Sequence, residues 1–200
     1  MLWKTQFSAL LKDFELKHQP VIIRVNKFDE KSAQDFNSKM ATAQSTGQKV
    51  VPVVIDSYGG QVYSLMSMIS AIKSSEIPVA TIVEGKAMSC GAVLLSFGEA
   101  GLRFADENAT IMIHDVSSGG QGKIEELKAD VAEADRLDEK IFTMMARNCG
   151  KKDDYFKKKV FNKKHADWFM DATEAKRHGL VNHIRVPKMT VKVDVDIDFE

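Results

Sequence analysis

Two almost fully apolar runs, each followed by a helical pattern, place the strongest constraint on the fold of this chain. Residues 50–55 and 79–83 are rich in valine and isoleucine and lack the alternation of a half-exposed strand. Such runs are typical of strands buried on both faces of a parallel sheet. Around them we expect helices over 30–45, 62–73 and 88–97 and strands near 21–25, 102–105 and 110–114. The alternation of strands and helices predicts an α/β fold.

Length and composition narrow the class of protein further. A chain of 200 residues is expected to form one domain, here spanning 1–200. Lys plus Arg equals Asp plus Glu at 28 each, so nothing directs the chain toward nucleic acid or an anionic membrane. Cys90 and Cys149 lie far apart, which argues against a disulfide framework or zinc site. No apolar stretch resembles a signal peptide or membrane span, so we expect a cytoplasmic location.

Both ends of the chain and one long internal segment carry clear periodicities. Residues 3–16 have helical spacing, so we expect an N-terminal helix within 1–19. Residues 189–200 alternate between apolar and charged side chains, which predicts a C-terminal strand. The longest helix is expected over 123–148, with an apolar stripe at steps of three or four. We interpret it as an oligomerisation element; a long surface helix on its own core is the alternative.

Ser89 is the candidate nucleophile because it lies between a predicted strand and a predicted helix. The backbone N–H groups at a helix start and the helix dipole favour a developing oxyanion there. The small neighbours Gly85 and Gly91 allow a peptide to approach closely. The plainer interpretation is that Ser89 is an N-cap.

His114 ends the apolar run at 110–113 and is the candidate base, with His165 as its competitor. The orienting acid is expected late in the chain. Asp171 begins a capping-box pattern and so has a structural task, which leaves Asp167 as the preferred acid. Asp115 follows His114 in a strand and is expected on the opposite face.

A glycine pair, Gly59-Gly60, follows the buried strand at 50–55. It can expose a backbone N–H to a ligand or simply form a turn.

Taken in order, these segments resemble the Clp protease proteolytic subunit family. The matching segments are 54–60, 85–92, 103–105, 112–114, 121–122 and 169–175, continuing at 178–181. The resemblance covers roughly residues 50–185, and its specificity comes from the ordered set rather than from any single motif.

The resemblance implies a ClpP/crotonase-like β-β-α superhelix with a long protruding handle helix at 123–148. It implies Ser89 as nucleophile, His114 as base and Asp167 as acid. It further implies that the backbone N–H groups of Gly60 and Cys90 form an oxyanion hole. The segment that flanks bound peptide is implied to be Gly119, Gly120, Gln121 and Gly122. No metal or organic cofactor is implied.

The resemblance also implies partners. They are peptide or unfolded-protein substrates, further copies of the chain in stacked heptameric rings, and a separate AAA+ unfoldase that uses ATP. The sequence departs from the family where Ala166 replaces the usual arginine and Val116 the usual proline. The usual N-terminal pore segment is not visible, and the helical pattern at 3–16 stands in its place. These departures concern ring pairing and the unfoldase more than the chemistry.

Other functions stay open at this point. A crotonase-fold enzyme acting on acyl-CoA would share the architecture without needing the three side chains. A signal-peptide peptidase of the Ser-Lys type would use Lys86 as its base, and a capsid-maturation protease would cleave a scaffold protein without an ATPase. A non-catalytic structural paralogue is the fourth possibility.

Overall fold

The computed structural model describes residues 13–16, 19–117 and 119–191 of the chain. Its elements alternate between strand and helix over most of the sequence, as predicted. In chain order they are β1 (Asp13–Leu16), β2 (Ile23–Val25), α2 (Glu30–Ser45), β3 (Val51–Ser57), α3 (Val62–Lys73), β4 (Val79–Met88), α4 (Cys90–Leu95), β5 (Arg103–Ala105), β6 (Thr110–Ile113), α5 (Ile124–Asn148), α6 (Tyr155–Asn162), β7 (Trp168–Asp171), α7 (Ala172–Arg177), β8 (His183–Ile184) and β9 (Lys188–Val191).

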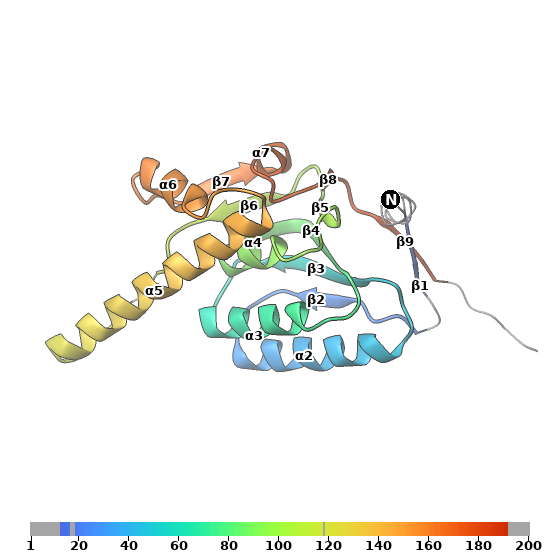
Figure 1. Ribbon diagram of the computed structural model, residues 1–200, viewed down its shortest axis with the longest axis horizontal. Helices are drawn as coiled ribbons and strands as arrows, with labels where there is room; N and C mark the ends of the chain where they lie inside the picture. The colour runs from blue at the N-terminus through green and yellow to red at the C-terminus, as the bar shows by residue number, and fades with distance from the viewer. Residues whose placement is uncertain (1–12, 17–18, 118, 192–200) are drawn as a thin grey trace, which may run out of the picture.

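The main sheet is parallel except at one edge. Strands β2, β3, β4, β5 and β8 lie side by side in that order, and β6 branches off β4 to pair with the antiparallel strand β7. The first half of β4 pairs with β5 at 81–83 and its end pairs with β6 at 86–88. Strand β4 therefore delivers the chain to residue 89 beside the end of β6 (Figure 1).

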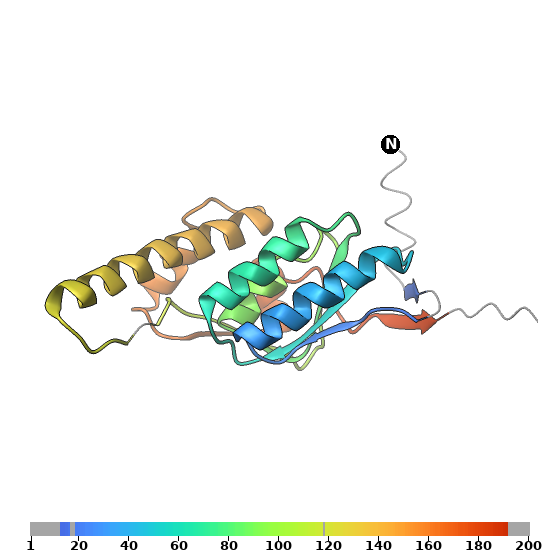
Figure 2. The same ribbon diagram turned by 90° about the horizontal axis from the view of Figure 1, so that it is seen from below.

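Helices α2 and α3 lie side by side against one face of this sheet, as both views show (Figure 2). Alternate residues of β3, including Val53 and Ile55, point toward the helices and are fully buried. Buried positions on α2 recur at helical spacing and supply the opposing layer: Ala33, Phe36, Met40 and Ala43. The apolar runs found in the sequence thus form the core of an α/β layer structure.

Part of the other face of the sheet, at one end, is covered by a small parallel ribbon of β1 and β9 (Figure 1). Phe14 and Leu16 of β1 are fully buried against Val54 and Phe104 of the sheet. The helix expected over 3–16 is therefore wrong for residues 13–16, while residues 3–12 lie outside the described part of the chain. Side chains two residues apart lie on the same side of a strand, so Phe14 and Leu16 face the sheet together. Burying each of these side chains contributes about 1.5–3 kcal/mol to the stability of the fold. Tertiary packing thus overrides the helical spacing.

The predicted C-terminal strand begins as β9 at residue 188, and residues 192–200 lie outside the described part of the chain. Strand β9 pairs with β1 of the same chain in parallel register, Phe14 facing Met189.

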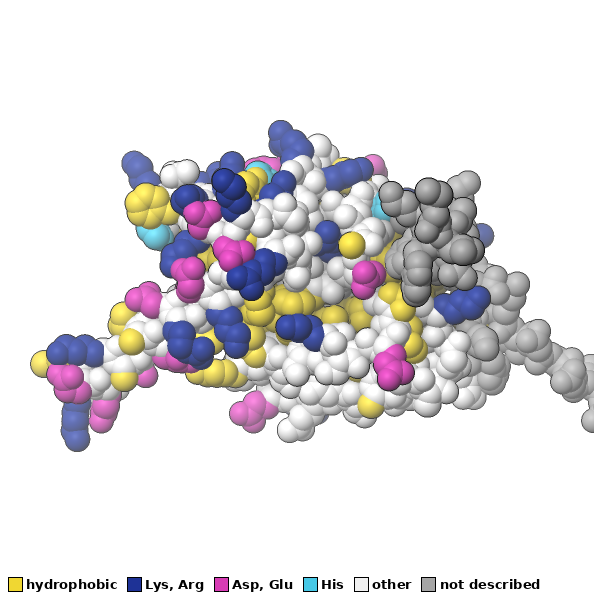
Figure 3. Space-filling view, in the orientation of Figure 1, with side chains coloured by type: hydrophobic (Ala, Val, Ile, Leu, Met, Phe, Trp, Pro, Cys, Tyr) yellow, Lys and Arg dark blue, Asp and Glu magenta, His cyan; other side chains and the backbone are white. Residues whose placement is uncertain are grey.

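Helix α5 extends well beyond the body of the molecule (Figure 1). Its buried residues lie in its second half, at Leu137, Ile141, Phe142, Met145 and Ala146, whereas Ile124 and Val131 in the first half are exposed. Figure 3 shows charged side chains of both signs over α5 and α6, and a strip of hydrophobic side chains across the middle of this face. No helix within the described residues has the length and apolarity to cross a membrane.

Candidate active site

Ser89 lies where β4 ends and α4 begins, at the junction that the sequence predicts. Its backbone has φ 53° and ψ −121°, a region that costs a residue with a side chain about 1–3 kcal/mol. The Ser89 N–H donates to the Met112 carbonyl at 2.9 Å, which ties the residue to β6. Among the described residues, the Ser89 hydroxyl makes no capping hydrogen bond to α4. An ordinary N-cap role therefore does not account for this strained serine.

The glycine pair approaches too closely to other groups for any side chain. A Cβ on Gly59 (φ 108°) would lie 2.7 Å from the Ser89 Cβ, and one on Gly60 (φ 149°) would lie 2.4 Å from the Phe28 carbonyl oxygen. Both φ angles also fall where L-residues are strained. Gly59 thus packs directly on the candidate nucleophile, which a turn alone would not require.

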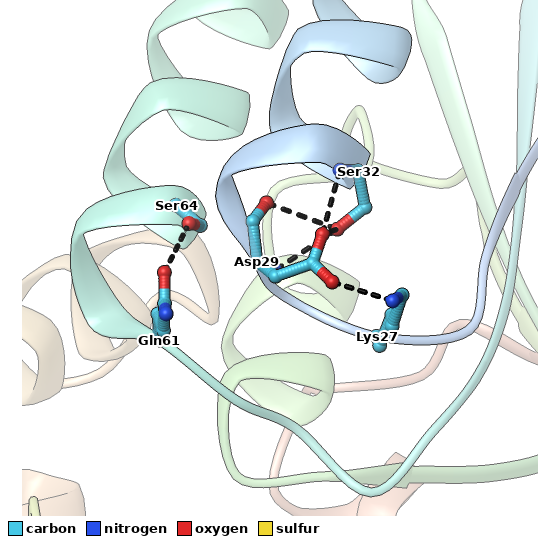
Figure 4. A network of polar contacts seen from close by, with 5 residues as sticks. All are labelled: Lys27, Asp29, Ser32, Gln61 and Ser64. Carbon is cyan, nitrogen blue, oxygen red and sulfur yellow. Dashed lines mark hydrogen bonds and ion pairs between the residues drawn. The ribbon is translucent and has the colours of Figure 1, made fainter.

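The segment before α2 holds the glycine pair in place. Gln61 donates its N–H to the Phe28 carbonyl at 2.8 Å, immediately after Gly60. Asp29 follows Phe28 and caps α2 by accepting the Ser32 N–H at 2.7 Å (Figure 4). This capping box anchors the Phe28 backbone, so the position of Gly60 depends on a structured neighbour rather than on a free loop.

His114 and Asp167 come together because of the antiparallel pairing of β6 and β7. Ile113 faces Trp168 in that ladder, so the next residue on each strand faces the other. His114 Nδ1 lies 3.8 Å from Asp167 Oδ1, which is ion-pair range but longer than a hydrogen bond. The side chain of His114 is 23% exposed and that of Asp167 is 52% exposed.

Ser89 and His114 line one pocket, together with Gly60 and Cys90. No hydrogen bond joins the Ser89 hydroxyl to the His114 ring among the residues that the structure describes. The geometry therefore gathers the predicted groups at one place, while the proton relay between them stays a prediction.

The competing histidine is engaged elsewhere. His165 Nδ1 and Asp115 Oδ2 lie 2.5 Å apart, and this pair links the loop before Asp167 to the residue after His114. Lys164 and His165 both have left-handed backbones, with φ 57° and 58°. Asp115 thus pairs across to the other strand's loop rather than orienting the candidate base.

The structural task predicted for Asp171 is confirmed. Its Oδ1 accepts the Glu174 N–H at 2.6 Å and so caps α7. Glu174 in turn accepts from the Trp168 indole N–H at 3.1 Å. Trp168 is buried, so the residue that follows Asp167 is firmly packed.

Sequence reasoning missed Asp138 of α5. Its Oδ1 accepts the Val116 N–H at 3.0 Å, two residues beyond His114, and it lines the same pocket as Ser89. Burial raises the pKa of the Asp138 carboxyl, and the nearby charge of Asp115 acts in the same direction. The available signal was its place three residues before Ile141 on the inward face of the helix.

Cys90 follows the candidate nucleophile and is buried against Gly60. Its thiol donates to the Gly60 carbonyl at 3.2 Å, and burial raises its pKa. A protonated thiol is a poor nucleophile, so Ser89 is the better candidate of the two neighbours.

Lys86 does not have the surroundings of a catalytic base. Its Nζ lies 2.8 Å from Asp56 Oδ1 and 4.4 Å from the centre of the Tyr58 ring. The hydrogen bond to Asp56 raises the pKa of Lys86, whereas a lysine base needs a lowered one. A Ser-Lys mechanism is therefore not favoured.

The segment expected to flank bound peptide forms an exposed loop. Residues 119–122 lie between β6 and α5, and position 118 is outside the described residues. A Cβ at Gly119 would contact nothing within 4 Å, so this position is open. The described residues hold no group of three or more His, Cys, Asp or Glu side chains arranged to bind a metal ion.

Comparison with known proteins agrees with the order of these features along the chain. The Clp protease family matches residues 5–188. The ATP-dependent Clp protease proteolytic subunit 2 of Frankia casuarinae is 31% identical over 170 residues, which cover 84% of this chain and 76% of that protein. The mixed α/β architecture with a mainly parallel sheet fits the ClpP/crotonase-like fold. The chain therefore belongs to the Clp protease family and is a peptidase of the Clp type.

Proposed function

We propose that the chain is a serine endopeptidase that hydrolyses peptide bonds with Ser89 as nucleophile, His114 as base and Asp167 as orienting acid. The observation that carries the proposal is the strained Ser89 in one pocket with His114, whose Nδ1 lies 3.8 Å from Asp167 Oδ1. Because Nδ1 is the nitrogen nearest Asp167, Nε2 is left to take the serine proton.

The reaction proceeds by acyl transfer. The Ser89 oxygen attacks the peptide carbonyl as His114 takes its proton, and the backbone N–H groups of Gly60 and Cys90 hold the oxyanion. His114 then protonates the leaving amine, the C–N bond breaks, and water hydrolyses the acyl-enzyme. Shortening the contact between His114 and Asp167 from 3.8 Å to a charge-assisted hydrogen bond of about 2.8 Å completes the site. No metal or organic cofactor takes part.

The test is labelling of the full chain with a fluorophosphonate probe. Ser89→Ala should abolish labelling and peptide hydrolysis, and His114→Ala should reduce both by orders of magnitude. Ser70→Ala, on the exposed side of α3, is the matched control and should label normally. Absence of labelling in the wild-type protein, under conditions that label a control protease, would refute the proposal in favour of an acyl-CoA enzyme or a non-catalytic paralogue.

The assembly is expected to follow the family as well. Peptides or unfolded proteins are the substrates, and copies of the chain associate through the handle helix α5, whose exposed Ile124 and Val131 lie seven residues apart on one side of the helix. We also propose a partnership with an ATP-driven unfoldase, because the Frankia protein is named as a subunit of an ATP-dependent protease. Ile124→Asp with Val131→Asp should reduce the sedimentation coefficient, and an unchanged value would exclude α5 as the contact.

A further inference from the structure

The pocket beside Ser89 and His114 is small. Its volume is about 50 Å³. A cavity that accepts benzene has a volume of about 150 Å³, and holding one water molecule takes about 10–15 Å³ of such space. The space next to the candidate nucleophile therefore accommodates a methyl or a slightly larger group and excludes an aromatic ring.

Helix α5 is the reason for the small volume. Four of its residues line the pocket, and the three apolar ones, Ile141, Phe142 and Met145, are only 6%, 2% and 0% exposed. The opposite walls are apolar too, formed by Val62, Val93 and Ile113. Phe142 is the bulkiest of the apolar lining residues and is fixed by the core around it, so its ring occupies space that a larger substrate side chain would need.

Carboxylates stand on the polar side of the same pocket. Asp138 and Asp115 both line it, and Asp138 is held there by the 3.0 Å hydrogen bond from the Val116 N–H. His165 pairs with Asp115. Asp138, by contrast, has no cationic side chain within hydrogen-bond distance among the described residues. It is therefore the carboxylate that would face a substrate group. An acidic side chain entering the pocket would be repelled and poorly solvated.

We propose that this peptidase selects a small, uncharged side chain at P1, the residue on the amino side of the cleaved bond, with Phe142 limiting its size and Asp138 excluding acidic residues. The inference rests on the proposed function, because the P1 side chain is the part of an acyl-enzyme nearest Ser89. Alanine fits the pocket, phenylalanine does not, and aspartate meets a carboxylate.

The magnitude follows from apolar specificity in general. One methylene too many in a closed pocket changes kcat/KM by about 10- to 200-fold. A phenylalanine exceeds an alanine by a whole ring, so we expect the P1-Ala peptide to be cleaved at least about 10-fold faster than the P1-Phe peptide. The P1-Asp peptide should be the slowest of the series.

The experiment compares fluorogenic peptides that differ only at P1, carrying Ala, Val, Phe or Asp, with the full-length protein. Phe142→Ala should raise the Phe/Ala ratio of kcat/KM by 10-fold or more, and Phe142→Leu should raise it less. Asp138→Asn retains an acceptor for the Val116 N–H and should raise the Asp/Ala ratio selectively. Phe36→Leu, a buried substitution in α2, is the control for lost packing and should leave both ratios unchanged.

The outcomes separate the inference from the function on which it rests. A wild-type protein that cleaves P1-Phe as well as P1-Ala, or a Phe142→Leu variant with an unchanged ratio, would overturn the size limit. An Asp/Ala ratio unmoved by Asp138→Asn would overturn the charge rule. If Phe142→Ala does not fold, Phe142→Leu carries the test. Failure of the wild-type protein to label or to cleave any peptide would instead refute the proposed function, and the inference with it.

Discussion

Gly59→Ala should disable the active site far more than it destabilises the fold. The new Cβ would lie 2.7 Å from the Ser89 Cβ and 3.1 Å from its Oγ. Restoring an ordinary contact of at least 3.4 Å requires a shift of about 0.7 Å, the difference between these distances. A misplacement of about 1 Å can cost about 100-fold in rate, so we expect acylation of Ser89 to slow by about 30-fold or more.

Gly101→Ala separates this contact from backbone strain. Gly101 has φ 89° and Gly59 has φ 108°, so both substitutions incur left-handed strain of about 1–3 kcal/mol. A Cβ on Gly101, however, would meet nothing within 4 Å. Fluorophosphonate labelling rates and thermal midpoints measured on both variants therefore isolate the effect on Ser89. Labelling of Gly59→Ala at the rate of Gly101→Ala would refute the steric argument.

Three further predictions concern the surroundings of the site. Asp115→Asn should lower kcat by up to about 5-fold with little change in KM, because the pair with His165 tethers the two strand ends and an exposed pair contributes up to about 1 kcal/mol. Asp115→Glu should restore kcat, and an equal loss there would contradict the tether. Burial raises the pKa of Cys149 to about 11 from 9.0, so the Cys149 thiol of the folded protein should resist iodoacetamide at pH 9.5. The folded protein should also lose stability as pH rises from 9 toward 11, because the thiol ionises first in the unfolded chain. Rapid alkylation of Cys149 in the folded protein would contradict this. Deleting residues 188–200 removes β9 and should lower the thermal midpoint of unfolding by several degrees, because β1 loses its partner strand and Phe104 loses the packing of Met189. An unchanged midpoint would show that the ribbon of β1 and β9 adds no stability.

The central α/β layers could be predicted from the sequence because their signal is dense and local. The runs at 50–55 and 79–83 are too apolar for any surface element, and the helices between them keep a regular period. The strand at 13–16 could not be predicted in the same way. Phe14 is compatible with either a helical or a strand pattern, and its choice depends on pairing with residues 188–191 and burial against Phe104, contacts that are remote in sequence.

The candidate site was predictable as residue types but not as geometry. A strand followed by Ser89 and a helix can be seen in the sequence, whereas neither the strained φ of Ser89 nor its hydrogen bond to Met112 on another strand can be. Asp138 was missed because a carboxylate on a charged helix gives no sign of which backbone N–H it will accept. Sequence patterns identify chemistry at the ends of elements, but pairing across the sheet decides which groups meet.

Ala166, where the resemblance implies an arginine, lies beside the open end of the same pairing. His114 and Asp167 are the first residues beyond the last rung of the β6–β7 ladder, so no backbone pairing holds them at a fixed separation. The pair of His165 and Asp115 closes this open end from within one chain, one residue beyond His114 and two residues before Asp167. We therefore expect the alignment of this candidate site to depend on that contact within the chain, and Asp115→Asn should make the labelling rate more sensitive to protein concentration.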